Sequence, residues 1–150
     1  MSRDASAARR EHYRWFLPIT TRWMDNDIYG HVNNVVYYAY FDTVANTYLI
    51  DEGGLDIHKG PVVGFVVSSG CEYLAPIAFP AGLEGGLRVD RLGNSSVRYG
   101  IGIFEEGQAE ASAYGHFVHV FVDRASQRPV PIPDGLRSAL AAISEGEHSS

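Results

Sequence analysis

Hydrophobic and polar positions in the first third of the chain predict a strand followed by a long helix. Residues 16–23 alternate as in an extended chain, and Pro18 is typical of the edge or the start of a sheet. Residues 35–54 are too long for a strand and close with two glycines, a common signal for the end of a helix. The polar residues of this helix share one narrow stripe, so other structure must enclose the rest of its surface. They are Asp42, Thr43, Asn46, Thr47 and Asp51.

The remaining chain alternates strand-like segments with short connections, which are typical of antiparallel neighbours. These segments are residues 61–74, 87–92, 96–104 and 112–123. The sequence G-L-E-G-G-L near residue 85 predicts a turn, and a short C-terminal helix is expected to begin at an N-cap residue, Asp134. One strand, one long helix and about four further strands predict an α+β chain. Its single antiparallel sheet, of about five strands, would curl round the helix.

The length of 150 residues predicts one domain, 1–150, with a core of about residues 15–140 and frayed ends at residues 1–12 and 146–150. The net charge of −6, with Lys59 as the single lysine, argues against a nucleic-acid surface. The sequence has no run of about 18 apolar residues and no apolar signal-peptide core, so we expect a cytoplasmic protein and no membrane partner.

Cysteine and histidine usage gives no sign of a metal or redox site. Cys71 is the single cysteine, which excludes an intramolecular disulfide and a cysteine-based metal site. We expect it to be a small buried hydrophobic residue. His116 and His119 are three residues apart on a predicted strand, a spacing that places them on opposite faces. We therefore expect no metal and no cofactor.

A dense polar stretch, R-W-M-D-N-D-I-Y-G-H-V-N-N, lies between the predicted strand and the predicted helix. Asn33 or Asn34 is a natural N-cap, and Gly30 permits a sharp turn. Free backbone N–H groups and the positive end of the helix dipole are therefore expected near Asp27, where they can polarise a carbonyl oxygen. On their own, Asp25 and Asp27 would be read as turn and capping residues, because an arbitrary D-N-D before a helix usually has that role.

The longer stretch R-W-M-D-N-D-I-Y-G-H-V-N-N-V-V-Y-Y-A-Y-F-D resembles the signature of the hot-dog fold thioesterases of the 4-hydroxybenzoyl-CoA thioesterase and acyl-CoA thioesterase group. Three later segments match the same family in order, so the resemblance covers about residues 15–140. They are C-E-Y-L-A-P-I at 71–77, R-L-G-N-S-S-V at 91–97 and V-F-V-D-R-A-S-Q-R-P-V-P-I-P at 120–133. The resemblance implies a hot-dog fold, in which a curled sheet wraps one central helix.

The resemblance also implies that the protein hydrolyses an acyl-CoA thioester to the free acid and coenzyme A. Asp27 aligns with the catalytic carboxylate of the family, as nucleophile or general base, while Asp25 would set the local field or the turn. One carboxylate can suffice, because the leaving thiol has a pKa of about 8.5 and needs little protonation. His31 is either a hydrogen-bond partner or general acid of the site, or a residue of loop packing.

Substrate contacts are expected both near Asp27 and at the G-N-S-S turn, where arginine and serine side chains can bind the phosphates or the pantetheine arm of coenzyme A. The expected substrate-binding residues are Gly30, Asn33, Asn34, Tyr37, Ser95, Ser96 and Arg98. A sheet curled round one helix leaves a free edge and a site with one wall. An obligate homodimer with the site at its interface is therefore expected, as the resemblance also implies, and two dimers can pair into a homotetramer.

Two other interpretations use the same residues. A hot-dog hydratase or dehydratase also acts on an acyl thioester, but those enzymes resemble D-x-N-P-x-H-x-D/E, and here Gly30 precedes His31 without a proline. A non-catalytic acyl-thioester-binding protein would share the fold but lack the carboxylate, whereas Asp27 is present. The aromatic residues of the predicted helix either wall an acyl pocket or pack in the core. They are Tyr37, Tyr38, Tyr40 and Phe41.

Overall fold

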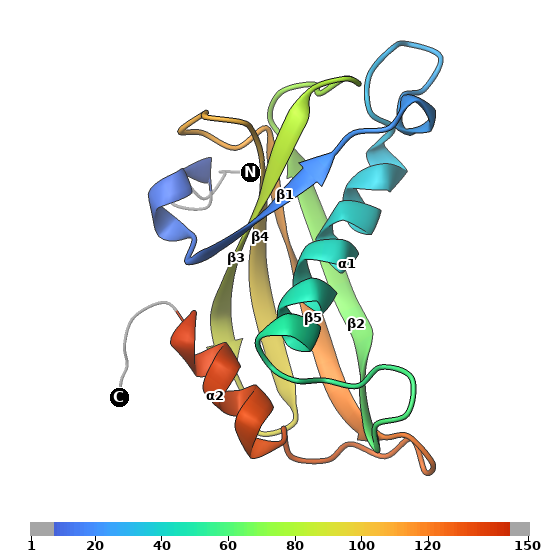
Figure 1. The fold of residues 1–150 in the computed structure, drawn as a ribbon, viewed down its shortest axis with the longest axis vertical. Helices are drawn as coiled ribbons and strands as arrows, with labels where there is room; N and C mark the ends of the chain where they lie inside the picture. The colour runs from blue at the N-terminus through green and yellow to red at the C-terminus, as the bar shows by residue number, and fades with distance from the viewer. Residues whose placement is uncertain (1–7, 145–150) are drawn as a thin grey trace.

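The computed structural model describes residues 8–144, which form five strands and two α-helices (Figure 1). The strands are β1 (Trp15–Thr20), β2 (Val62–Tyr73), β3 (Gly82–Leu92), β4 (Ser96–Glu105) and β5 (Ala113–Asp123). The helices are α1 (Asn34–Asp51) and α2 (Asp134–Ala142), and two short 3-10 helices, Arg10–His12 and Trp23–Asp25, flank β1. No helix among the described residues is long and apolar enough to cross a membrane.

The strands form one antiparallel sheet in the order β1-β3-β4-β5-β2, so that β1 and β2 are its edges. The long helix α1 crosses one face of this sheet, and α2 packs beside β3 (Figure 1). Pro18 lies in the edge strand β1, opposite Glu84, as its missing N–H predicted. The predicted α+β architecture, with a five-stranded sheet curled round one long helix, is confirmed.

The core lies between α1 and the sheet, and this position explains why the helix is apolar on most sides. Four side chains of α1 are completely buried, and the polar stripe predicted from the sequence remains at least partly exposed. The four are Phe41, Val44, Ala45 and Leu49. Each large apolar side chain buried in this way contributes about 1.5–3 kcal/mol to folding.

The segment G-L-E-G-G-L is the first half of β3, so the prediction of a turn there was wrong. Its two central glycines make room for other elements. A Cβ atom on Gly85 would strike the Val44 side chain of α1, and one on Gly86 would lie 2.9 Å from the ring of Tyr13. These glycines therefore allow close packing against both faces of the strand, and they do not mark a turn.

The segment that precedes β1 packs on the sheet from Ala8 onward, so the expected fraying of residues 8–12 was wrong. The N–H of Ala111 donates to the carbonyl oxygen of Ala8 at 2.8 Å. A small second core holds the segment on the face of the sheet opposite α1, and its members are Tyr13, Phe104, Ala111 and the partly buried Phe16. The fraying predicted for residues 1–7 and 146–150 falls outside the described residues.

β1 ends at Thr20, before the predicted strand end, because hydrogen bonds made by Thr21 and Arg22 turn the chain. The hydroxyl of Thr21 donates to the carbonyl of Ala81 at 2.7 Å, and the carboxylate of Asp25 accepts the N–H of Arg22 at 2.8 Å. Trp23 consequently begins a short 3-10 helix, and its side chain is 75% exposed rather than packed on a strand face.

The two helix starts differ in how well the sequence predicted them. Asn33 is the N-cap of α1, since its Oδ1 accepts the N–H of Val35 at 2.9 Å. The pair of glycines marks the end of α1 as predicted, and Gly54 has a φ of +69° in the left-handed region. At α2 the prediction was wrong: the N-cap is Pro133, and no side chain caps the helix.

His116 and His119 lie on opposite faces of β5, as their spacing predicted. The Nε2 atom of His116 lies 3.3 Å from the hydroxyl of Ser68, whereas Nδ1 of the buried His119 lies 3.1 Å from the hydroxyl of Tyr99. Burial lowers the pKa of His119 to about 4. Within residues 8–144, no three His, Cys, Asp or Glu side chains are close enough to hold a metal ion.

We expect the free energy of unfolding to fall between pH 6.5 and pH 4 because of His119. The unfolded chain binds a proton near the ordinary pKa of 6.5, and the folded chain does so only near 4. The contribution of neutral His119 to the free energy of unfolding is therefore fully present above pH 6.5 and is lost as the pH falls toward 4. The loss is at most about 3 kcal/mol. His119→Gln keeps a partner for Tyr99 but does not titrate, so urea unfolding should show a flatter pH dependence.

The exposed His58 offers a matched control for this measurement. We expect His58→Gln to unfold with the pH dependence of the parent. A His119→Gln profile as steep as that of the parent between pH 6.5 and pH 4 would contradict the prediction.

Candidate active site

The polar stretch between β1 and α1 folds into a small hairpin, residues 26–32, which we call the Asp27 loop. Asn26 and Val32 face each other as an antiparallel pair, and the N–H of Asp27 donates to the carbonyl of His31 at 2.8 Å. The N–H of Gly30 donates to the carbonyl of Asp27 at 3.0 Å. Gly30 has a φ of +82°, which agrees with the predicted sharp turn. The hairpin thus brings Asp27 beside His31.

Asp27 borders a hollow of about 440 Å³ at the N-terminal end of α1. Its Oδ1 accepts the N–H of Tyr29 at 2.8 Å, which fixes the direction of the half-buried carboxylate. Among the described residues, Oδ2 accepts no hydrogen bond. Four predicted site residues meet in this hollow: Asp27, His31, Asn34 and Tyr37.

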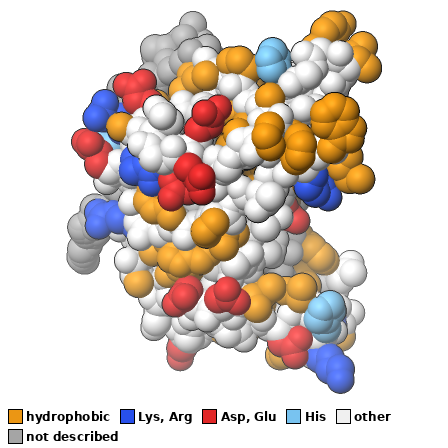
Figure 2. Space-filling view, turned by 45° about the horizontal axis from the view of Figure 1, so that its top comes forward, with side chains coloured by type: hydrophobic (Ala, Val, Ile, Leu, Met, Phe, Trp, Pro, Cys, Tyr) orange, Lys and Arg blue, Asp and Glu red, His pale blue; other side chains and the backbone are white. Residues whose placement is uncertain are grey.

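A second hollow, of about 1160 Å³, lies against the same loop, and both Asp27 and Tyr29 border the two hollows. Two further predicted residues, Gly30 and Asn33, line this second hollow. Large apolar side chains complete its walls, and they are exposed at the surface: Trp23, Met24 and Ile28, the last 92% exposed. Apolar side chains gather over this end of the molecule, at the upper right of Figure 2.

Residues at the N-terminal end of α1, whose backbone N–H groups can act as donors, border the same hollow as Asp27. Asn33 uses its side chain and its carbonyl to accept the N–H groups of Val35 and Val36, both at 2.9 Å. No hydrogen bond within residues 8–144 uses the N–H groups of His31 and Asn34. Because free N–H groups and the positive end of the helix dipole favour negative charge, this side of the hollow suits an oxyanion.

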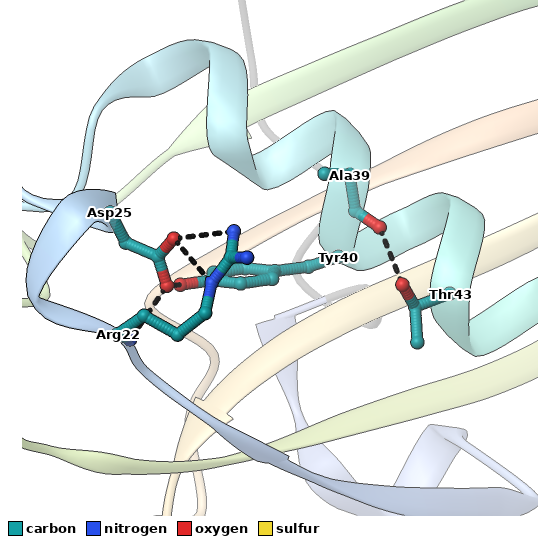
Figure 3. A network of polar contacts seen from close by, with 5 residues as sticks. All are labelled: Arg22, Asp25, Ala39, Tyr40 and Thr43. Carbon is teal, nitrogen blue, oxygen red and sulfur yellow. Dashed lines mark hydrogen bonds and ion pairs between the residues drawn. The ribbon is translucent and has the colours of Figure 1, made fainter.

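Asp25 directly precedes the Asp27 loop, is completely buried, and points its carboxylate at Arg22 and Tyr40 (Figure 3). The guanidinium of Arg22 donates to its Oδ1 at 2.9 and 3.1 Å, and the Arg22 N–H and the Tyr40 hydroxyl each donate to its Oδ2 at 2.8 Å. Burial favours a higher pKa, but the hydrogen bonds from Arg22 and Tyr40 outweigh it and lower the pKa of Asp25. Asp25 is therefore an ionised, fully bonded carboxylate that does not border either hollow.

The aromatic residues of α1 divide between the hollow and the core. Tyr37 borders the hollow, and burial raises its pKa to about 12, so its hydroxyl keeps its proton at neutral pH. Tyr40 is buried as a partner of Asp25, Phe41 is buried in the core, and Tyr38 packs against that core. One aromatic residue of the helix therefore walls the hollow, and the other three pack in or against the core.

Tyr73 is a wall of the hollow that the sequence reasoning missed. Its ring packs edge-on against Tyr37, with ring centroids 5.2 Å apart, and its hydroxyl donates to the carbonyl of Asn34 at 3.2 Å. Tyr73 belongs to the segment C-E-Y-L-A-P-I, and Leu74, Ala75 and Pro76 of that segment also line the hollow. The match of this segment to the family was the signal that would have found them.

The structure does not bring Ser95, Ser96 and Arg98 to Asp27 within one protomer. The turn between β3 and β4 lies at the opposite end of the sheet from the N-terminus of α1 (Figure 1). Ser96 pairs with Val120 at that end, and nine residues of β4, or about 30 Å, separate Ser96 from Glu105 at the other end of the strand. Arg98 lines a different hollow, of about 290 Å³. Their role in binding coenzyme A stays a prediction.

A five-stranded sheet curled round one helix, with a carboxylate and free N–H groups where the chain enters that helix, defines a hot-dog protein of the thioesterase type. Residues 21–140 match the family model of the thioesterase-like superfamily. The chain belongs to this superfamily, and the expected enzyme class, a thioester hydrolase, agrees with it.

Solved structures share this fold. The PA5185 protein of Pseudomonas aeruginosa is 64% identical, with a TM-score of 0.91 over 94% of this chain and 99% of that chain. The PA2801 protein of the same organism, for which a thioesterase function is proposed, is 31% identical, with a TM-score of 0.77 over 83% and 96%. Slr0204 of Synechocystis, a 1,4-dihydroxy-2-naphthoyl-CoA thioesterase, is 15% identical, with a TM-score of 0.76 over 84% and 94%, and it shares the fold alone. No curated protein sequence is significantly similar to the chain.

Proposed function

We propose that the protein is an acyl-CoA thioesterase, which hydrolyses an acyl-CoA thioester to a carboxylic acid and free coenzyme A. Membership of the thioesterase-like superfamily supports the reaction class. The observation that carries the proposal is the carboxylate of Asp27, which borders one hollow together with His31 and Asn34, two residues whose N–H groups make no hydrogen bond within residues 8–144.

Asp27 either attacks the thioester carbonyl carbon or removes a proton from the water that attacks it. In both courses negative charge develops on the carbonyl oxygen, and we propose that the free N–H groups of His31 and Asn34, two residues that border the hollow, stabilise it. The C–S bond then breaks, and the thiolate needs little protonation because its thiol has a pKa of about 8.5. When Asp27 is the nucleophile, this step leaves a mixed anhydride on its carboxylate, and a water molecule hydrolyses the anhydride to the free acid and the free carboxylate. The exposed side chain of His31, in the same hollow, can supply that proton.

We also propose a homodimer that pairs through the edge strand β2, with two dimers forming a tetramer as the larger assembly. β2 has a neighbour on one side only, and the middle of the strand carries exposed apolar side chains, of which Val67 is 60% exposed. An exposed apolar edge strand is a template for pairing with another chain. Tyr73 in the same strand walls the hollow, so the pairing would place the second copy beside the site.

A charge in the middle of this edge is expected to weaken the pairing. Val67→Lys places an ammonium group among exposed apolar neighbours, and charged edge residues oppose strand pairing. We expect light scattering to show a smaller mass than that of the parent, together with a loss of thioesterase activity of at least about 10-fold. Ala125→Lys, in an exposed turn, is the control and should keep the mass of the parent. An unchanged mass for Val67→Lys would contradict the β2 interface.

Release of free thiol from a panel of acyl-CoA esters tests the proposed function. The panel should hold short, long, branched and aromatic acyl groups, and the ester with the highest kcat/KM names the acyl class. Cleavage of no ester would contradict the proposal. If an uncleaved ester nevertheless raises the unfolding temperature, the protein binds acyl thioesters without hydrolysing them.

A further inference from the structure

We infer that Asp25 is a positioning residue, whose buried carboxylate and backbone carbonyl together hold the Asp27 loop in a fixed place against α1. This inference rests on the proposed function of Asp27, and it assigns to Asp25 a task distinct from reaction with the substrate. Asp25 borders neither hollow at the loop, so it acts only through the residues that it holds.

The carboxylate of Asp25 ties the entry of the loop to the second turn of α1. Its four hydrogen bonds come from Arg22, which precedes the loop, and from Tyr40, which projects from the helix (Figure 3). Because Asp25 is fully buried and Arg22 is mostly exposed, the arginine side chain covers the carboxylate from outside. Charge-assisted hydrogen bonds of this kind fix geometry more strongly than neutral ones.

The backbone of Asp25 closes the other end of the loop. Its carbonyl oxygen accepts the N–H of Asn33 at 2.8 Å, and Asn33 is the N-cap of α1. Between these two residues, the Asp27 N–H bonds to the carbonyl of His31 at 2.8 Å. One residue therefore fixes both strands of the hairpin, and with them the place of Asp27 relative to the free N–H groups at the helix N-terminus.

The hydrogen bonds that the Asp25 carboxylate and carbonyl accept, which we call the clamp, come from Arg22, Asn33 and Tyr40 and none of them from the sheet, so their loss should loosen the loop without unfolding the sheet. Asp25 does not belong to the cluster of buried apolar residues, although Val32 of the loop and Tyr40 do. In Asp25→Asn the amide nitrogen cannot accept a hydrogen bond, so donors would face it where the carboxylate now accepts. Tyr40→Phe is the milder variant, because it removes one donor to Asp25 and retains the ring.

Hydrogen exchange measured by NMR tests the clamp independently of any chemistry. We expect the N–H groups of Asp27 and Asn33 to exchange at least about 10-fold faster in Asp25→Asn than in the parent, with the protection of Ile101 in β4 unchanged. Tyr40→Phe should give a smaller increase at the same two sites. Exchange of Asp27 and Asn33 at the rates of the parent would overturn the inference.

Turnover per folded molecule tests whether the clamp serves the reaction. We expect Asp25→Asn to lower kcat by about 10-fold or more and to change KM less than about 3-fold. Asp56→Asn is the matched control, since Asp56 also accepts backbone N–H groups but lies beyond the C-terminal end of α1, and its kcat should stay within about 2-fold of the parent.

A double variant separates positioning from general damage. If Asp25 acts through Asp27, then Asp25→Asn has no further effect on the residual rate once Asp27→Asn is present. An unchanged kcat in Asp25→Asn, or full additivity with Asp27→Asn, would overturn the positioning role. An Asp27→Asn variant as active as the parent would instead overturn the proposed function, and the exchange measurement would still decide whether the clamp exists.

Discussion

Asp27→Asn is expected to lower kcat by at least about 100-fold and to leave the fold intact. An amide can neither attack the thioester carbonyl as a carboxylate does nor take a proton from water, and loss of a general base typically removes about 100- to 10,000-fold in rate. The amide oxygen can still accept the N–H of Tyr29, so the turn that holds residue 27 should persist. Thiol release with the best ester of the panel, at matched folding by circular dichroism, gives the measurement.

The control for this variant is again Asp56→Asn, which makes the same chemical change in an exposed loop away from both hollows at the site. It should retain the parent rate. Activity of Asp27→Asn within about 3-fold of the parent would contradict a catalytic carboxylate at this position. The polar stretch before α1 would then serve binding or structure.

Gly115→Ala is expected to destabilise the protein by about 3 kcal/mol or more. A Cβ atom at residue 115 would fall on the carbonyl oxygen of Gly70 in β2, and it would lie 2.7 Å from the ring of Phe41 in α1. Neither the Gly70 carbonyl nor the Phe41 ring can move away easily, because β2 is hydrogen-bonded to β5 there and Phe41 is completely buried. Urea unfolding should therefore show a lower midpoint, or the variant should fail to fold.

Gly135→Ala tests whether the cause is this contact or the loss of a glycine in general. Gly135 lies in α2, and a Cβ atom there would meet no atom within 4 Å. Because alanine is the better helix former, we expect this control to be neutral or up to about 1 kcal/mol more stable than the parent. Equal destabilisation by both substitutions would contradict the packing argument.

Those parts of the fold that depend on local periodicity could be predicted from the sequence. The apolar helix with its polar stripe and the alternation in β4 and β5 both follow from the spacing of side chains on one face. The start of β3 could not be predicted in this way, because Gly85 and Gly86 are ordinary turn residues until α1 and Tyr13 are packed against them. Fraying was predicted for residues 8–12 for a similar reason, since their partners lie far away in the sequence.

In the candidate site too, residues close together in the sequence could be predicted, whereas a residue distant in the sequence could not. Asp27, His31, Asn34 and Tyr37 lie within eleven positions of the chain, so one turn and one helix start are enough to bring them together. Tyr73 reaches the hollow only through the pairing of β2 with β5, which no local pattern specifies. The chemistry of Ser95, Ser96 and Arg98, together with the resemblance of the G-N-S-S turn to the family, predicts contact with coenzyme A, but sequence alone does not show at which end of the sheet these residues lie.

The edge strand β2 joins two properties that are usually separate in a protein. Its exposed middle is the surface through which we propose that two copies meet, and its last residue, Tyr73, is a wall of the hollow that Asp27 borders. The proposed dimer interface and the wall of the site then belong to the same strand, so dimer formation would affect the site directly. The rate per molecule would then fall on dilution, as the paired form gives way to single chains.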